Sequence, residues 1–293
     1  MTDRMTYFEA RKWAAQKLEQ RGVPDADLDA ELLLEYASSG SRTDLLLKDT
    51  EPMPDDELSR YLQAVFLRKK RIPLQQITGK AYFMGMEFTV SDKVLTPRQD
   101  TEILAEEAID RIRERQKVSR GGVRVLDLCT GSGCLIIAAA KFCPGIEAVG
   151  TDISGEALDI ARINVQNSGT GVTLTESDLF DRVEGRFDVI MSNPPYIRSG
   201  EICSLMEEVR DHEPRLALDG GADGLHYYRE IARLAGTYLK DGGWLLFEIG
   251  ADQGKDVTDI LRAHGYSDLG LIRDLSGLDR VVCGRARADG TGG

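Results

Sequence analysis

From about residue 100 onward, apolar runs suited to strands alternate with segments whose apolar residues recur at helical spacing. The expected strands lie near residues 123–128, 147–151, 172–175, 187–192, 244–249, 268–272 and 279–284. The expected helices lie at 101–115 and near 134–142, 155–167, 225–239 and 253–264. Such alternation produces βαβ units, and therefore a mostly parallel sheet with helices on both faces. We expect an α/β fold whose ligand lies beyond the carboxyl ends of the strands, near the point where the strand order reverses.

The first 75 residues follow a different pattern, which is helical. Thr6 and Glu9 form a capping box ahead of the first helical stretch. Two further stretches, "ADLDAELLLEYA" and "DDELSRYLQAVFLRKKR", also have apolar residues at helical spacing. After them, "GKAYFMGMEFTV" places aromatic and β-branched residues around Met84-Gly85, which is typical of a hairpin. We expect a small N-terminal helical bundle that a β-hairpin joins to the α/β part.

Composition and charge disfavour several classes of protein. No stretch approaches the roughly 20 continuous apolar residues of a membrane span, and the N-terminus has no apolar core like that of a signal peptide. The five cysteines show no C-x-x-C spacing, so we expect free thiols in a reducing cytoplasm rather than disulfides or a zinc site. The three histidines show no ligand spacing, so no metal is expected. The net charge of −12 disfavours direct binding of nucleic acid, because Lys and Arg make most phosphate contacts.

The stretch "VRVLDLCTGSGCLIIAAA" has the pattern of a buried strand, a loop of small residues and a helix. Glycines let a backbone approach a ligand closely, and the helix N-terminus beyond them offers free N–H groups. Asp152 ends the next strand, 19 residues after Gly133, where an acid can bind the two hydroxyls of a ribose. The third glycine of a dinucleotide fingerprint is missing. The pattern from Asp127 to Gly133 instead resembles the first motif of S-adenosylmethionine-dependent methyltransferases, with a plain strand-to-helix turn as the alternative.

Asn193-Pro194-Pro195-Tyr196 follows a strand that should lie inside the sheet. Prolines cannot extend a central strand, because they donate no N–H to the ladder. The Asn193 amide oxygen and the Pro194 carbonyl are acceptors that the prolines hold stiffly, and Tyr196 can supply a flat face. Together they fit a planar –NH2 group. Attack of such a nitrogen on a methyl sulfonium places positive charge on it, which preorganised acceptors stabilise. A plain turn after the strand is the alternative.

Nearly the whole chain resembles the HemK-type protein-(glutamine-N5) methyltransferases, which methylate peptide-chain release factors, with the weakest likeness in the first 70 residues. The likeness rests on "IPLQQITGKAYFMGMEFTV", "VLTPRQDTEILAE", "LDLCTGSG", "GTDIS", "SNPPYI", "EEVRDHEPRLALDGGADGLHYYR", "LLFEIGADQG" and "RDLSGLDRVV", which follow in the family's order. It implies a seven-stranded, Rossmann-like class I methyltransferase domain over residues 99–286. It also implies a helical substrate-recognition domain over residues 1–75 and a hairpin linker over 76–98, and we expect a flexible tail at 287–293.

The resemblance further implies the reaction and its residues. The expected activity is methylation of the side-chain amide nitrogen (N5) of the glutamine in the Gly-Gly-Gln motif of release factors, with S-adenosyl-L-methionine as the cofactor. The residues implied for cofactor binding are Cys129, Thr130, Gly131, Ser132, Gly133, Asp152, Ile153, Asp178, Leu179 and Asn193. The residues implied for substrate binding are Asn193, Pro194, Pro195 and Tyr196, of which Asn193, Pro194 and Tyr196 would act in catalysis.

Four positions depart from the family pattern. Cys129 stands where the family usually has Gly, so we expect this position to avoid a glycine-only backbone conformation. Leu179 replaces an aromatic residue, which would exchange ring stacking for aliphatic contact. In "PRQDTE", Gln99 removes a rigid turn residue, and Asp100 is a good N-cap for the helix that follows.

Two other functions are compatible with these residues. An adenine-N6 methyltransferase of DNA or RNA would share Asn-Pro-Pro-Tyr, because adenine N6 is also a planar –NH2 group, but it would need a basic groove for its substrate. The best basic run, "RKKR" at 68–71, is better explained as a charge cluster at a helix C-terminus. A non-catalytic S-adenosylmethionine-binding adaptor is the second alternative, although an adaptor would not need aligned acceptors such as Asn193.

Overall fold

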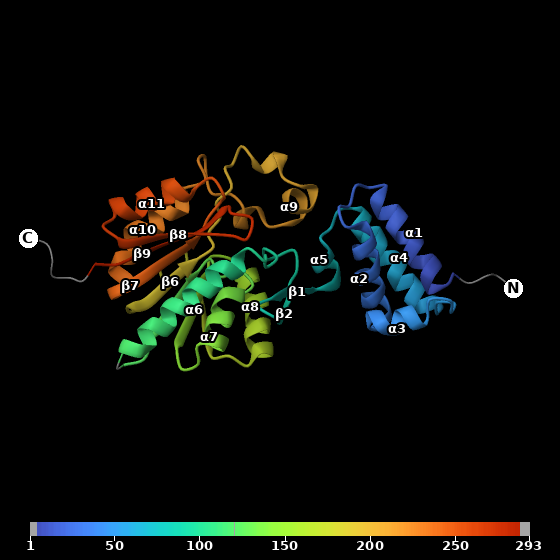
Figure 1. Ribbon diagram of the computed structural model, residues 1–293, viewed down its shortest axis with the longest axis horizontal. Helices are drawn as coiled ribbons and strands as arrows, with labels where there is room; N and C mark the ends of the chain where they lie inside the picture. The colour runs from blue at the N-terminus through green and yellow to red at the C-terminus, as the bar shows by residue number, and fades with distance from the viewer. Residues whose placement is uncertain (1–4, 120, 288–293) are drawn as a thin grey trace, which may run out of the picture. The chain divides into compact units, whose positions relative to one another are not determined.

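The computed structural model describes residues 5–119 and 121–287 and divides into two compact units (Figure 1). The helical unit comprises the chain up to Lys80 together with Met206–His212, and the α/β unit comprises Ala81–Leu205 and the chain from Glu213 onward. The sequence pattern gives no sign that Met206–His212 belongs with the helices. The expected flexible tail at 287–293 lies outside the described residues except for Arg287.

The helical unit contains α1 (Tyr7–Glu19), α2 (Ala26–Ser38), α3 (Arg42–Leu47), α4 (Asp55–Lys69) and α5 (Leu74–Thr78). The predicted capping box of α1 is confirmed, because the Thr6 side chain accepts the N–H of Glu9, whose carboxylate accepts the N–H of Thr6 at 2.9 Å. The apolar faces of the longer helices bury a shared core that includes Leu18, Leu33 and Tyr61. The sequence pattern does not predict α3 and α5, because one or two turns are too short to show a helical period.

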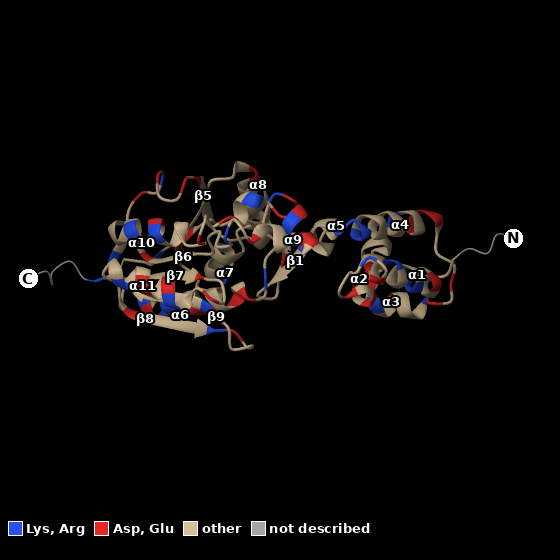
Figure 2. Ribbon diagram, turned by 90° about the horizontal axis from the view of Figure 1, so that it is seen from above, with Lys and Arg blue, Asp and Glu red and all other residues tan. Residues whose placement is uncertain are grey.

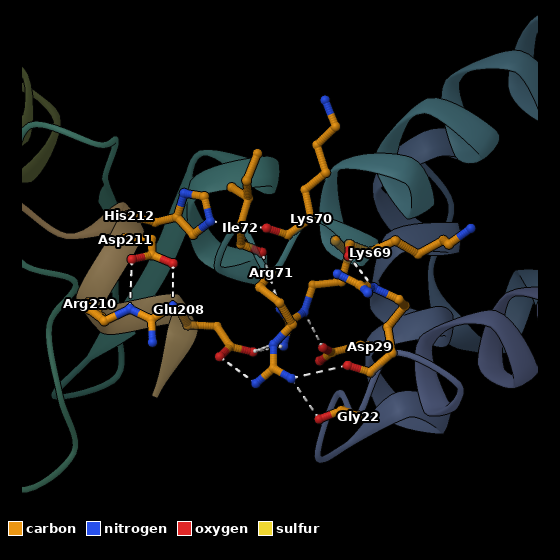
Figure 3. A network of polar contacts seen from close by, with 12 residues as sticks. Gly22, Asp29, Lys69, Lys70, Arg71, Ile72, Glu208, Arg210, Asp211 and His212 are labelled. Atoms are coloured by element: carbon orange, nitrogen blue, oxygen red, sulfur yellow. Dashed lines mark hydrogen bonds and ion pairs between the residues drawn. The ribbon is translucent and has the colours of Figure 1, made fainter. Parts of the chain in front are cut away.

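A short helix, α9 (Glu207–His212), belongs to this unit through a network of charged side chains (Figure 3). Arg71 donates to both carboxylate oxygens of Glu208, at 2.6 and 2.5 Å, and to the carbonyl of Gly22 at 2.8 Å. Arg68 donates to Glu208 at 3.0 Å and to Asp29 at 2.6 Å. Burial acts to raise the pKa of Glu208, but the hydrogen bonds it accepts, those of Arg71 and Arg68 among them, lower it below its ordinary value. These contacts fasten a segment that follows Asn-Pro-Pro-Tyr in the chain to the helical bundle.

The predicted hairpin is confirmed as β1 (Lys80–Phe83) and β2 (Met86–Thr89). Its turn residues Met84 and Gly85 have φ angles of 50° and 73°, the left-handed values that a two-residue type I′ loop requires. Asn164 links β2 to the glycine loop, because its Nδ2 donates to the carbonyl of Thr89 at 3.0 Å and to that of Ser132 at 2.9 Å. The hairpin is therefore tied to the loop predicted to bind the cofactor.

The α/β unit is built on a seven-stranded sheet with the order β5-β4-β3-β6-β7-β9-β8. Its strands are β3 (Arg124–Leu128), β4 (Glu147–Asp152), β5 (Val172–Glu176), β6 (Phe187–Ser192), β7 (Leu239–Glu248), β8 (Ser267–Arg273) and β9 (Asp279–Arg285). The first five pair in parallel, whereas β9 is antiparallel to both of its neighbours. This confirms the predicted mostly parallel sheet. β7 begins earlier than predicted, because Leu239 already pairs with Phe187 before an irregularity in the ladder.

Helices cover both faces of the sheet, as predicted (Figure 1). They are α6 (Thr101–Val118), α7 (Cys134–Phe142) and α8 (Gly155–Ser168) on one face, and α10 (His226–Tyr238) and α11 (Gly254–Ala263) on the other. Each face buries its own core, with Ile112 and Ile136 in the first and Tyr228 and Leu261 in the second. Two 3₁₀ segments that the sequence pattern does not predict lie at Ile202–Ser204 and Arg215–Ala217.

Acidic and basic residues are interspersed along the helices (Figure 2). On α6, for example, Arg111 pairs with Glu107 at 2.6 Å and with Glu114 at 3.2 Å. Asp100 precedes α6 as predicted, but its side chain makes no capping hydrogen bond and instead pairs with Arg280 at 3.1 Å. Many basic groups are thus matched by neighbouring carboxylates, as expected for a chain with a net charge of −12.

Candidate active site

The carboxyl ends of four parallel strands meet at one edge of the sheet. The ladder pairs Leu128 with Thr151, Leu128 with Ser192, and Ser192 with Phe247. The residues that follow these positions are Cys129, Asp152, Asn193 and Glu248. The strand order reverses here, since β4 and β5 lie on one side of β3 while β6 and β7 lie on the other. An open α/β sheet binds its ligand at such a reversal, so this edge is the candidate active site.

A buried carboxylate and one glycine shape the loop after β3. Asp127 is fully buried and accepts the hydroxyl of Thr130 at 2.6 Å, so it supports the loop from below. Burial raises the pKa of Asp127 to about 7. Gly133 has a φ angle of 81°, and an added Cβ would lie 3.2 Å from Cδ1 of Ile137, so both the conformation and the space favour glycine. Gly131 also has a left-handed φ angle, of 54°, but it faces open space, with nothing within 4 Å of an added Cβ.

The expectation that Cys129 avoids a glycine-like backbone is wrong. Its φ angle is 58°, in the left-handed region that costs a residue with a Cβ about 1–2 kcal/mol. The turn is held there by the N–H of Thr130, which donates to the carbonyl of Thr151 on β4 at 2.9 Å. Leu179 is also left-handed, with a φ angle of 43°. Two strained residues therefore lie at the same site, as functional sites often tolerate.

Asp152 ends β4 and lies half-buried at this edge. Its Oδ2 accepts the N–H of Gly131 and its Oδ1 accepts the N–H of Ser154, both at 2.9 Å. Burial raises the pKa of Asp152 above its ordinary value, although these two N–H groups oppose the shift. Each oxygen keeps a further lone pair, so the carboxylate can also accept hydrogens from a ligand.

A cavity opens over this edge of the sheet. Of the residues predicted to bind cofactor or substrate, those that line it are Cys129, Thr130, Gly131, Ser132, Asp152, Ile153, Asp178, Leu179, Asn193 and Pro195. Gly133, Pro194 and Tyr196 are not among the lining residues. Ile153 is 50% exposed, and Asp178 is exposed as well, so a bound molecule would find both apolar and polar surface here.

The turn that contains Asn-Pro-Pro-Tyr is held by the segment around Gly220. The N–H of Ile197 donates to the carbonyl of Leu218 at 3.0 Å, and the carbonyl of Tyr196 accepts from Nε2 of Gln253 at 3.0 Å. Gly220 lies so close that an added Cβ would be 2.7 Å from Cα of Tyr196. These contacts hold the backbone that follows the motif in one conformation.

Asn193 and Tyr196 lie in different surroundings. Asn193 lines the cavity, and its Nδ2 donates to Oγ1 of Thr101, the first residue of α6, at 3.4 Å. Tyr196 packs against the core under α10, where burial raises the pKa of its hydroxyl. Within the motif, the cavity is thus lined by Asn193 and Pro195.

Two segments that the sequence analysis did not assign to the site form a further wall of the cavity. The lining residues are 93–98, Pro214, Leu216 and Ala217. Glu213 joins the two segments, because it accepts the N–H of Thr96 at 3.2 Å and the guanidinium of Arg98 at 2.8 Å. Burial raises the pKa of Glu213. Neither segment comes directly after a strand of the predicted parallel sheet, so the polar residues at the ends of those strands do not point to them.

Within residues 5–119 and 121–287, no group of three or more His, Cys, Asp or Glu side chains is placed to hold a metal ion. In the same part of the chain, every helix is too short or too polar to cross a membrane.

Comparison with known proteins matches two family models to this chain. Residues 9–79 match the PrmC N-terminal domain, and residues 112–222 match the methyltransferase small domain. The chain is 40% identical over 289 residues to the release factor glutamine methyltransferase of Geobacter sulfurreducens, covering 97% of this chain and 99% of that protein. It is 38% identical over 282 residues to the release factor glutamine methyltransferase of Bacillus subtilis, covering 95% and 97%.

Among solved structures, the hMettl16 catalytic domain in complex with MAT2A 3′UTR hairpin 6 is 14% identical, with a TM-score of 0.56, covering 80% of this chain and 83% of that chain. At that identity the likeness concerns the fold alone. The sequence identity to the bacterial relatives extends over nearly the whole length of both proteins and includes the helical part. This chain therefore belongs to the release factor glutamine methyltransferase family.

Proposed function

We propose that this chain transfers the methyl group of S-adenosylmethionine to the side-chain amide nitrogen (N5) of the glutamine in the Gly-Gly-Gln motif of peptide-chain release factors. Membership of the family supports the reaction. The observation that carries the chemistry is the position of Asn193, which lines the cavity at the end of β6, next to the loop and the acid that suit the cofactor.

The residues at the cavity fit S-adenosylmethionine, which when bound supplies a methyl group on a sulfonium. Asp152 would accept the hydroxyl hydrogens of the ribose. The backbone of residues 129–133 would contact the cofactor, and the open space beside Gly131 leaves room for that approach. Asp178 and Leu179 would lie near the adenine, with Leu179 offering aliphatic contact.

The acceptors Asn193 Oδ1 and the carbonyl of Pro194 would take the two hydrogens of the glutamine amide. An amide nitrogen is a weak nucleophile, because its lone pair is delocalised. As the N–C bond forms and the S–C bond breaks, positive charge develops on the nitrogen, and acceptors fixed in advance stabilise it. The two prolines limit the motion of this turn and so help to aim the lone pair at the methyl group. The sulfur would keep the electrons of the broken S–C bond as a neutral thioether, and the nitrogen would release one hydrogen to the solvent as a proton, which leaves an N-methyl amide.

We assign recognition of the release factor to the helical unit. Residues 9–79 match the PrmC N-terminal domain, and this unit exposes large apolar side chains of the kind that protein partners cover, including Leu47 at 79% and Phe66 at 55%. A protein partner also suits an acidic chain better than a polyanion does. All five cysteines are free thiols, which supports the cytoplasm as the location.

The proposal is tested by incubating the protein with a purified release factor and S-adenosylmethionine, followed by mass spectrometry of the tryptic peptide that contains Gly-Gly-Gln. One added methyl group on the glutamine is expected. A release factor with Gln→Glu at this position is the matched control, since a carboxylate has no hydrogens for the two acceptors and should stay unmodified. Methylation of duplex DNA adenine, with the peptide unchanged, would overturn the proposal.

A further inference from the structure

Glu248, the last residue of β7, is a buried acid that the proposed reaction does not itself require. It is 2% exposed, and the pairing of Ser192 with Phe247 places it level with Asn193 on the neighbouring strand. Among the described residues, its Oε2 is buried without a hydrogen-bond partner. Burying a carboxylate is costly unless the charge is paired or hydrogen-bonded. A role at the carboxyl edge of the sheet would account for its presence.

Thr101 connects Glu248 to Asn193. Nδ2 of Asn193 donates to Oγ1 of Thr101 at 3.4 Å. Both side chains lie close enough to Glu248 for their hydrogen bonding to lower its pKa against the effect of burial. Because Oγ1 of Thr101 accepts from Asn193, its single hydrogen is free to be donated, and a carboxylate such as that of Glu248 only accepts. The nitrogen of the Asn193 amide is therefore directed toward Thr101, and the carboxylate of Glu248 on the neighbouring strand is an acceptor for a second hydrogen of that group.

The orientation of the Asn193 amide decides whether the site can bind an –NH2 group. The oxygen and nitrogen of an amide are alike in size but opposite in hydrogen bonding. A flipped Asn193 would present its own –NH2 hydrogens to those of the glutamine. We propose that Glu248 is a positioning residue that, together with Thr101, holds the Asn193 nitrogen away from the acceptor nitrogen and leaves Oδ1 to face it. This inference rests on the proposed function.

Neither an ion pair nor packing explains why a carboxylate stands at the buried position of Glu248. Neighbouring Arg280 already pairs with Asp274 at 3.0 Å and with Asp100 at 3.1 Å, so two other carboxylates match its charge. The hydroxyl of Tyr228 donates at 2.9 Å to the backbone carbonyl of Glu248, a contact that any residue could accept. A negative acceptor behind Asn193 would also polarise the amide and make Oδ1 a stronger acceptor.

Protonation of Glu248 should change this arrangement near neutral pH. Burial raises its pKa to about 7, against the hydrogen bond from Thr101, the charge of Arg280 and the hydrogen bond from Asn193. The charge of Glu248 interacts electrostatically with five neighbouring charged or titratable groups, which are Asp100, Arg280, Tyr196, Tyr228 and Cys134. Protonated Glu248 carries a donor of its own that competes with those of Thr101 and Asn193. Turnover should therefore rise as the pH increases through about 7.

The test compares Glu248→Gln, Thr101→Val and the conservative Thr101→Ser in the full-length chain, with S-adenosylmethionine and a release factor. We expect kcat to fall about 10–100-fold in Glu248→Gln and Thr101→Val, less than after loss of an acceptor itself. Thr101→Ser keeps the hydroxyl and should retain a kcat near that of the wild type. The double variant Thr101→Val/Glu248→Gln should be no slower than the slower single variant, because both break one chain of hydrogen bonds.

Two readouts separate positioning from a merely structural role. The Kd for S-adenosylmethionine should be the same in the wild type and the variants, and the rise of kcat near pH 7 should disappear in Glu248→Gln. Wild-type kcat in Glu248→Gln, or a loss seen equally in cofactor binding and thermal stability, would overturn the inference. If Glu248→Gln does not fold, equal rates for Thr101→Val and Thr101→Ser would overturn it. An inactive wild-type protein would overturn the proposed function instead, and the inference with it.

Discussion

Replacing Asp152 should weaken the binding of S-adenosylmethionine. The carboxylate already accepts the N–H groups of Gly131 and Ser154, each at 2.9 Å, so it shapes the turns after two strands. Its remaining lone pairs are the acceptors that we propose for the ribose. A hydrogen bond to a charged group contributes about 1.5–3 kcal/mol. Asp152→Ala should therefore raise the Kd by a factor of roughly 10–150.

Asp152→Asn is the sharper variant, because it keeps the shape of the side chain. An amide retains a single acceptor oxygen and would present its –NH2 group to the N–H of either Gly131 or Ser154. It cannot satisfy both turns, so we expect the affinity to fall nearly as far as in Asp152→Ala. A full recovery of affinity in Asp152→Asn would show that the negative charge and the second acceptor are not needed.

Isothermal titration calorimetry measures the Kd directly, and thermal unfolding shows whether each variant is folded. Asp159→Ala is the matched control, since it removes an exposed carboxylate of α8 that pairs with Arg162 outside the cavity. Its Kd should equal that of the wild type. Burial raises the pKa of Asp152, so affinity should begin to fall at a higher pH than an ordinary Asp would require. Equal Kd values for Asp152→Ala and the wild type would refute the assignment.

Three further perturbations test separate parts of the structure. Asn193→Ala should lower kcat about 10²–10³-fold, and a smaller loss in a methylation assay would contradict its role as an acceptor. Glu208→Ala should lower the free energy of unfolding by about 3 kcal/mol in urea, because it leaves buried arginines short of a partner. The fold lowers the pKa of Glu208, so its contribution to the free energy of unfolding is present above its ordinary pKa and is lost as the pH falls through the lowered value. The difference in free energy of unfolding between Glu208→Ala and the wild type should therefore shrink in acid. Cys129→Gly should have a higher Tm than Cys129→Val, because only glycine relieves the left-handed strain; equal Tm values would argue against strain.

The sequence predicts that Asp152 and Asn193 lie near each other, because each stands at the carboxyl end of an apolar run that is expected to form a strand of the parallel sheet. Parallel strands bring their carboxyl ends to one edge, so two polar residues from distant parts of the chain must lie near each other there. The capping box at Thr6 and the hairpin turn at Met84-Gly85 are predictable for a similar reason, since both depend on residues close together in the sequence.

Features that depend on tertiary contacts are not predictable in this way. Arg71 and Glu208 lie 137 residues apart, and a single charge pair leaves no periodic trace in the sequence, so the place of α9 in the helical unit could not be foreseen. The backbone of Cys129 follows the contacts of its turn rather than the preference of its side chain. Asp100 has the right position for an N-cap, but its carboxylate forms an ion pair with Arg280 instead of capping the helix.

The most direct test of the proposed reaction identifies the atom that receives the methyl group. A release factor labelled with nitrogen-15 in its glutamine side chains is incubated with the protein and with S-adenosylmethionine that carries a carbon-13 methyl group. We predict one new methyl signal in the NMR spectrum, split by a one-bond coupling to nitrogen-15, and no such signal with the Gln→Glu release factor. A methyl signal without nitrogen coupling, or transfer to a residue outside Gly-Gly-Gln, would contradict methylation of the glutamine amide.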